Sequence, residues 1–128
     1  FDYNRAMLLL AVLEKRAGLE ISRCDAYINV VGGLNIEEPT ADLAAMIALA
    51  SSFRGRAVDS STVAIGEIGL TGELRAVDNL EQRLSEVRRL GFTQAIVPFH
   101  GSARAPVQEG LHLARVRTVR EAIDLAVQ

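Results

Sequence analysis

The sequence contains very few of the residues that build common metal and disulfide centres. Cys24 is its single cysteine, tryptophan is absent, and only two histidines occur in 128 residues. A lone cysteine cannot close an internal disulfide, which favours a reducing, cytoplasmic location. Zinc sites of the cysteine and histidine type need several such side chains. We therefore expect no metal site in this chain.

Long apolar runs and a dominant charge are missing as well. Apolar residues make up 49% of the chain, yet no run approaches the roughly 20 residues of a membrane span. The net charge is −2, so the chain as a whole does not attract polyanions, although a local basic surface is compatible with this value. We expect one soluble domain over 1–128 without a membrane partner. Because Phe1 falls inside a helical pattern, we expect a domain cut from a longer protein.

Helical and strand patterns alternate along the chain, which is typical of an α/β fold. Asp78 or Asn79 is expected to cap the third helix and Thr118 the last one. The apolar stripe of the third helix ends at Leu90. The pattern predicts helices over 2–17, 39–53, 81–90 and 119–127, and strands over 25–31, 61–68, 73–76, 95–98 and 111–116, with a surface loop over 100–110.

Glycine-rich motifs for nucleotides are not present. The Gly32-Gly33 pair lacks the glycine spacing of a dinucleotide fold, and no phosphate-binding P-loop sequence occurs. We therefore expect no cofactor in this domain.

Two segments carry a recognisable motif. Pro39-Thr40-Ala41-Asp42 opens a predicted helix, and the run from Gly66 to Glu81 reads GEIGLTGELRAVDNLE. Both resemble the proteolytic domain of Lon proteases, in which a serine at the position of Thr40 and a lysine at that of Glu81 form the catalytic dyad. The resemblance implies an α/β, Lon proteolytic-domain-like (ribosomal protein S5 domain 2-like) fold, with a mixed sheet packed with helices.

Thr40 and Glu81 make a degenerate dyad. A hydroxyl nucleophile needs a well-matched base, and a carboxylate with a pKa of about 4 is a poor one. Asp42 would add negative charge where an oxyanion must form, and Lys15 is the only amine side chain. We predict that the domain has no catalytic residue and is not an enzyme. Thr40 is interpreted as a helix N-cap, and Asp42 and Glu81 as partners of helix dipoles.

Within the Lon-like superfamily, the chain resembles the C-terminal domain of bacterial RadA/Sms DNA-repair proteins. The resemblance implies a parent DNA-dependent ATPase with a zinc ribbon and a RecA-like domain upstream, so Zn, ATP and Mg are expected there. It also implies a homo-oligomer that forms a hexameric ring, as in that family, and contact with recombinase-type repair proteins. The matching segments are LLLAVLEKRAG at 8–18, NVVGG at 29–33, EP at 38–39, ADLA at 41–44, GEIGLTGELR at 66–75 and LGF at 90–92.

The resemblance further implies DNA contact, for which arginine is the suitable residue. Guanidinium groups fit phosphates and bind duplexes without reading sequence. The aromatic residues, Phe99 among them, are predicted to be mostly core, which favours duplex contact over stacking of single strands. The alternative for each arginine is an ion pair with a glutamate such as Glu14, Glu73 or Glu86. The predicted DNA-binding set is Arg5, Arg16, Arg54, Arg56, Arg75, Arg83, Arg88 and Arg89.

Three functions therefore stay open for this domain. The first is a non-catalytic assembly and DNA-contact domain of a recombination ATPase. The second is a residual peptidase, because family members commonly have alanine where Thr40 supplies a hydroxyl. The third is a pure protein-interaction module whose arginines lie in subunit contacts.

Overall fold

The computed structural model describes residues 42–56, 58–59, 61–102 and 109–127. The predicted helix at 2–17 and strand at 25–31 lie outside these residues. The described elements are α3 (Asp42–Arg54), β1 (Thr62–Ala64), β2 (Glu67–Ile68), β3 (Leu74–Arg75), α4 (Leu80–Arg89), β4 (Gln94–Pro98), β5 (His112–Val116) and α5 (Val119–Ala126).

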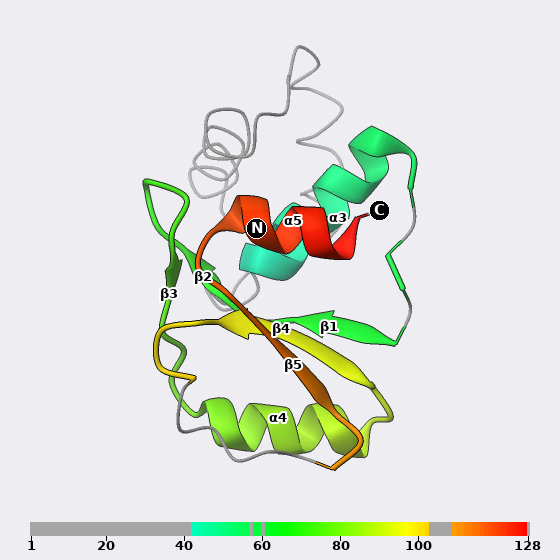
Figure 1. Ribbon diagram of the computed structural model, residues 1–128, viewed down its shortest axis with the longest axis vertical. Helices are drawn as coiled ribbons and strands as arrows, with labels where there is room; N and C mark the ends of the chain where they lie inside the picture. The colour runs from blue at the N-terminus through cyan, green and yellow to red at the C-terminus, as the bar shows by residue number, and fades with distance from the viewer. Residues whose placement is uncertain (1–41, 57, 60, 103–108, 128) are drawn as a thin grey trace.

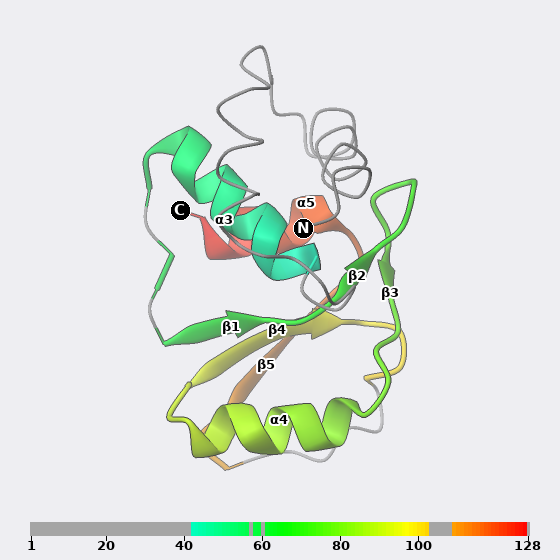
Figure 2. The ribbon, with the colours of Figure 1, turned by 180° about the vertical axis from the view of Figure 1, so that it is seen from behind.

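These elements form an α/β structure, as their alternation predicted. Strands β1, β4 and β5 make a parallel sheet in the order β1-β4-β5. Helices α3 and α5 cover one face of this sheet and α4 covers the other (Figures 1 and 2). Strands β2 and β3 pair antiparallel as a hairpin beside the carboxyl ends of the parallel strands (Figure 1). Parallel and antiparallel strands of the described residues thus belong to separate sheets instead of one mixed sheet.

The central strand β4 supplies both halves of the core. Its side chains alternate between the two faces of the sheet. Ile96 packs in the cluster that contains buried residues of α3 and α5, whereas Ala95 and Val97 pack against Leu84 and its neighbours on α4. All of these side chains are buried. Burial on both faces explains why β4 has no polar side chain between Ala95 and Pro98.

The predicted single strand at 61–68 is wrong. β1 ends at Ala64, and β2 begins at Glu67 in the other sheet. Between them, the Gly66 carbonyl accepts a hydrogen bond of 3.0 Å from the Leu43 amide at the start of α3. A Cβ at Gly66 would lie 3.4 Å from the Leu43 side chain. The missing side chain therefore lets the backbone pass close to α3, a contact that a continuous apolar run does not reveal.

The predicted ends of α4 and α5 are only partly right. Asn79 precedes α4 with φ 58° and makes no side-chain capping bond, so the predicted cap is wrong. Asparagine tolerates this left-handed conformation better than most residues. The hydroxyl of Thr118 accepts a 3.2 Å hydrogen bond from the Glu121 amide, which confirms the cap of α5. Gly91 ends α4 as expected, but Leu90 is 65% exposed and is not part of the buried stripe.

A buried carboxylate anchors α3 to the hairpin. Asp42 is 0% exposed, and its Oδ2 accepts a hydrogen bond of 3.1 Å from the Ile68 amide. The amide of the next residue, Leu43, donates a second bond to the Gly66 carbonyl of the same segment. A bond to an ionised acceptor is stronger than a neutral one, the more so away from water. The first turn of α3 is therefore held against the segment that leads into β2.

Replacing Asp42 by alanine should lower the free energy of unfolding by about 1–3 kcal/mol, because the buried Ile68 amide loses its hydrogen-bond acceptor. Urea unfolding followed by circular dichroism measures the change. Ala44→Ser, at an exposed position of the same helix, is the matched control and should change stability by less than about 0.5 kcal/mol. Equal losses in the two variants would contradict the anchoring role.

Candidate functional site

The degenerate dyad is described at one of its two positions. Thr40 lies outside the described residues, so its N-cap role stays a prediction. Glu81 is exposed in the first turn of α4, where a carboxylate meets the positive end of the helix; this agrees with its predicted place. The helix that begins at Asp42 and the helix that carries Glu81 cover opposite faces of the sheet (Figure 1).

Asp42 lies in the first turn of α3, as predicted, but it does more than face a helix dipole. Its carboxylate is buried and bonded to the Ile68 amide. It therefore places a hydrogen-bond acceptor at the helix start, where stabilisation of an oxyanion would require hydrogen-bond donors. Sequence reasoning missed this bond, because the partner amide is 26 residues further along the chain.

The described candidate arginines do not form one surface. Arg54 and Arg56 lie at the end of α3, and Arg75 lies on the hairpin strand β3. The others are on α4, across the sheet from α3 (Figure 2). Arg5 and Arg16 fall outside the described residues. The α4 members of the set are Arg83, Arg88 and Arg89.

Carboxylates pair with the arginines of α3 and of the hairpin. Arg54 Nη1 lies 4.0 Å from Asp124 Oδ1 on α5. Arg75 Nη1 lies 3.8 Å from Glu67 Oε1, and its Nε lies 4.0 Å from Glu73 Oε1. All of these groups are partly exposed, so each pair contributes little stability. The pairs nevertheless lower the positive charge that these arginines offer to a polyanion.

Arg89 on α4 is paired in the same way. Its Nε donates a 3.0 Å hydrogen bond to Glu86 Oε2, and its Nη2 contacts Glu86 Oε1. The hydrogen bond lowers the pKa of Glu86 and raises the pKa of Arg89. The ion-pair alternative is thus confirmed for Arg89 with Glu86 and for Arg75 with Glu73.

Arg88 instead bonds to a neutral acceptor, and one of the bonds of Arg83 is of the same kind. Arg83 Nε donates to the Asp78 carbonyl at 3.1 Å, and Arg88 Nε donates to the Glu109 carbonyl. A carbonyl orients a guanidinium without cancelling its charge. Arg88 is exposed, as its position off the apolar stripe predicted. Arg88 therefore remains suited to phosphate contact.

The sequence analysis did not select the arginines near the end of β5. Arg117 follows β5, and its guanidinium carbon lies 3.9 Å from the centroid of the Phe99 ring. Phe99 is 39% exposed, so its assignment to the core is wrong. Arg115 donates from Nε and Nη2 to the Ser102 carbonyl at 3.3 Å. The two-residue spacing of Arg115 and Arg117 at the end of a predicted strand could have marked them as a pair on one face. Their approach to the segment of Phe99 depends on tertiary structure.

The hairpin turn is closed by Glu73. Its Oε2 accepts hydrogen bonds from the Thr71 amide, at 3.1 Å, and from the Thr71 hydroxyl. These bonds, the hydroxyl's above all, lower the pKa of Glu73. A Cβ at Gly69 would overlap the Glu73 carboxylate. The turn is therefore well ordered, and it presents Leu70 with 66% exposure at its tip.

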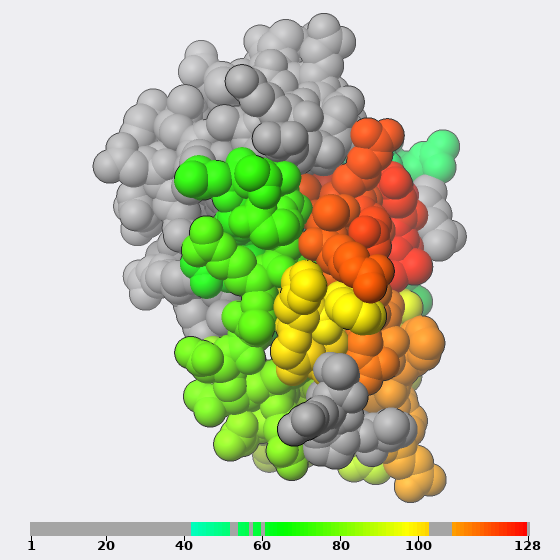
Figure 3. All heavy atoms as spheres, turned by 60° about the vertical axis from the view of Figure 1, so that its left-hand side comes forward, coloured from blue at the N-terminus to red at the C-terminus, as the bar shows by residue number. Residues whose placement is uncertain are grey.

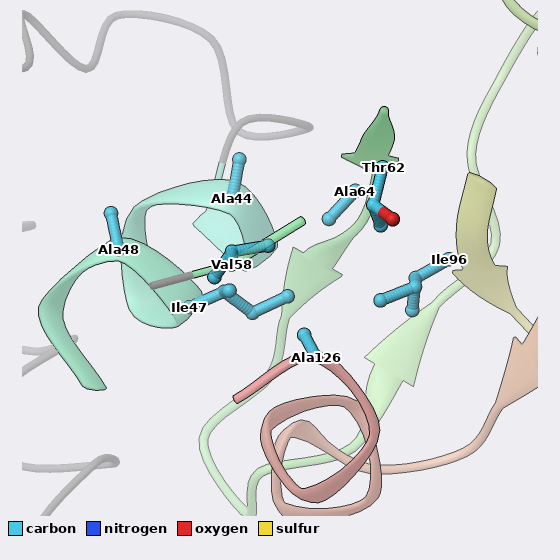
Figure 4. A pocket seen from close by; sticks show the side chains of 8 residues that line it. All are labelled: Ala44, Ile47, Ala48, Val58, Thr62, Ala64, Ile96 and Ala126. Carbon is cyan, nitrogen blue, oxygen red and sulfur yellow. The ribbon is translucent and has the colours of Figure 1, made fainter. Parts of the chain in front are cut away.

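A small apolar pocket of about 160 Å³ lies between α3, β1 and the end of α5 (Figure 4). Among the described residues that line it, Thr62 is the only polar one, and the Thr62 hydroxyl already bonds to Gln94 at 3.2 Å. The described lining thus lacks the converging polar groups of a catalytic centre. Its lining residues are Ala44, Ile47, Ala48, Val58, Thr62, Ala64, Ile96 and Ala126.

The part of the chain that the structure describes contains neither a metal-type cluster nor a membrane helix. No group of at least three histidine, cysteine or acidic side chains is placed there to hold a metal ion. None of the helices described is both long and apolar enough to cross a membrane.

Comparison with known proteins gives consistent matches. The family model described as subunit ChlI of Mg-chelatase matches residues 7–101. DNA repair protein RadA of Synechocystis sp. is 57% identical over 97 residues, or 76% of this chain and 19% of that protein. RadA of Halalkalibacterium halodurans is 41% identical and RadA of Chlamydia pneumoniae 44% identical, each over 98% of this chain and 28% of the relative. The chain thus spans less than a third of the length of these relatives.

Glu73→Gln should lower stability at neutral pH and have less effect in acid. The folded-state pKa lies below the ordinary value of 4.5, so the contribution of this carboxylate is present above that value and is lost as the pH falls through the folded pKa. Because the side chain is partly exposed, we expect less than about 1 kcal/mol. Chemical unfolding of both proteins at about pH 7 and about pH 3 measures the difference.

Glu109→Gln is the control for this comparison, because no hydrogen bond to the Glu109 carboxylate occurs among the described residues. Its effect on stability should be small at both pH values. An effect of Glu73→Gln that did not change with pH would contradict a role for the ionised carboxylate.

Proposed function

Because this chain belongs to the family described as subunit ChlI of Mg-chelatase, with DNA repair proteins named RadA among its relatives, we propose that it is a non-proteolytic, Lon-like scaffold domain of a DNA repair and recombination ATPase. The matches confirm the resemblance to RadA predicted from the sequence. In this proposal the domain supports ring oligomerisation and binds DNA without sequence preference while branched intermediates are processed. Zinc, ATP and Mg belong to domains upstream, recombinases contact the parent protein, and the protein acts in the cytoplasm.

The buried carboxylate of Asp42 is the observation that carries the non-proteolytic role. It lies two positions after Thr40 and is bonded to the Ile68 amide. A peptidase would need donors and an activated hydroxyl at this helix start. Glu81, at the position of the dyad lysine, is instead an exposed acid at the start of α4.

The Lon-like fold is supported by the way the motif is used. The segment GEIGLTGELR contains β2, the turn and β3, and its first residues contact the start of α3. The two segments that carry the resemblance therefore meet in space at the hydrogen bond between the Ile68 amide and Asp42, although they are distant in sequence.

A difference between two arginines of α4 supports a DNA contact on this helix. Arg89 is paired with Glu86, whereas Arg88 bonds to a carbonyl and keeps its charge. Both lie in the last turn of the helix. The phosphates of a duplex that approaches this end of the helix would be attracted more strongly by Arg88 than by Arg89.

A subunit-contact module is the second candidate, favoured by Leu70. This side chain is 66% exposed at the tip of a turn that Glu73 holds in place. A single exposed leucine is common, but one presented on a rigid projection suits contact with a neighbouring subunit. Arginine substitutions would then alter assembly before they altered DNA affinity.

Sedimentation of the chain, with and without duplex DNA and at two salt concentrations, tests the proposal. We expect an oligomer that binds duplex with an affinity that falls steeply with salt. Arg88→Ala should weaken duplex binding about fivefold and lower the salt slope by about one. Arg89→Ala, in which a paired charge is lost, is the matched control and should have the smaller effect.

A monomer at every concentration would contradict the ring, and absence of duplex binding at low salt would contradict the DNA contact. Equal effects of Arg88→Ala and Arg89→Ala would remove the assignment of Arg88.

The peptidase alternative predicts turnover of casein that Thr40→Ala abolishes. We expect no turnover by the unmodified chain, because the dyad position holds the carboxylate of Glu81 instead of an amine. Turnover that is lost in Thr40→Ala but kept in Thr71→Ala, at an exposed position on the hairpin, would reinstate a protease.

A further inference from the structure

Aromatic and cationic side chains gather at the carboxyl ends of β4 and β5. Phe99 follows β4 directly, and Arg117 follows β5 directly, with the guanidinium carbon 3.9 Å from the ring centroid. The His100 ring meets the Phe99 ring edge-on at 5.9 Å. In Figure 3 the segment after β4, in yellow, lies between the green hairpin and the orange junction of β5 and α5. Ligands of open parallel sheets commonly bind outside these strand ends.

Hydrogen bonds hold this segment in a fixed position. The Phe99 amide donates to the Val116 carbonyl at 2.8 Å, and the hydroxyl of the buried Ser102 donates to the Phe99 carbonyl at 2.9 Å. Arg115 bonds to the Ser102 carbonyl through two nitrogens. Gly101 adopts φ 80°, which favours glycine. The exposed ring and its two neighbours are therefore pre-organised by groups that are themselves satisfied.

The positive charge of this cluster is not cancelled within the described residues. Arg115 and Arg117 form no ion pair with an acidic side chain described there, in contrast to the pairs of Arg54, Arg75 and Arg89. The Glu121 carboxylate accepts a 3.4 Å bond from the backbone amide of Arg117 and not from its guanidinium. The exposed Phe99 ring thus lies against one guanidinium, of Arg117, and on the same segment as the Ser102 carbonyl that Arg115 bonds.

We propose that Phe99 and Arg117 form a stacking site for a base of single-stranded DNA, with Arg115 attracting its phosphates. The inference rests on the proposed DNA-binding function and names the form of DNA that this face takes. A base can stack on the exposed ring or on the guanidinium plane. Duplexes keep their bases stacked on each other, so only an unpaired strand can use such a site. Sequence-based reasoning favoured duplex contact because it placed Phe99 in the core.

Binding to a thymidine oligonucleotide that contains one 2-aminopurine tests this site, because stacking quenches the fluorescence of that base. The unmodified chain should quench it and bind it, and Phe99→Ala should lose the quenching and about tenfold in affinity. Arg117→Lys keeps the charge but not the plane, so it should lose part of the quenching while the salt dependence is retained. Leu90→Ala removes an apolar side chain that is more exposed than Phe99, at the end of α4, and is the control.

The outcomes separate the site from the proposed function. If the unmodified chain binds neither single-stranded nor duplex DNA, the proposed function fails and the site with it. If the chain binds DNA and Phe99→Ala keeps both affinity and quenching, the stacking site is wrong while the DNA contact stands. If Phe99→Ala changes sedimentation but not DNA affinity, the cluster is a protein contact and the inference is overturned. Matching circular dichroism spectra show that the variants fold.

Discussion

The hydrogen bond between the Asp42 carboxylate and the Ile68 amide is the contact on which this end of the molecule depends. It fixes the hairpin against α3, and the hairpin in turn holds the start of α5. The Leu74 amide donates to the Arg117 carbonyl, and the Val119 amide donates to the Gly72 carbonyl, both at 2.9 Å. The buried side chain of Asp42 at one helix start is thus connected through two short strands to Arg117, whose guanidinium covers Phe99.

Arginine serves two purposes on this surface, and local partners decide which. Where a carboxylate lies within reach, as beside Arg75 or Arg89, the guanidinium completes a local pair and helps to define the structure. Where the acceptor is a carbonyl, as for Arg88 and Arg115, the guanidinium is oriented and the acceptor does not balance its positive charge. Counting arginines along a sequence therefore overestimates a polyanion-binding surface, and acceptor chemistry is the better guide.

Much of the fold followed from local patterns. Alternating apolar periods located α4, β4, β5 and α5, and Thr118 was found as a cap because its bond is local. The break between β1 and β2 was missed, since it depends on the close passage of Gly66 beside Leu43. Residue spacing likewise found exposed Arg88 but not the exposure of Phe99, which is decided by a strand that lies further along the chain.

The burial of Asp42 also has an evolutionary consequence. In a domain of the proposed Lon-like fold, exchanging Glu81 for an amine would leave the buried side chain of Asp42 at the helix start. Replacing Asp42 as well would withdraw the acceptor from the Ile68 amide and loosen the hairpin. The same bond that stabilises the hairpin therefore opposes any substitution that would free this helix start for other chemistry.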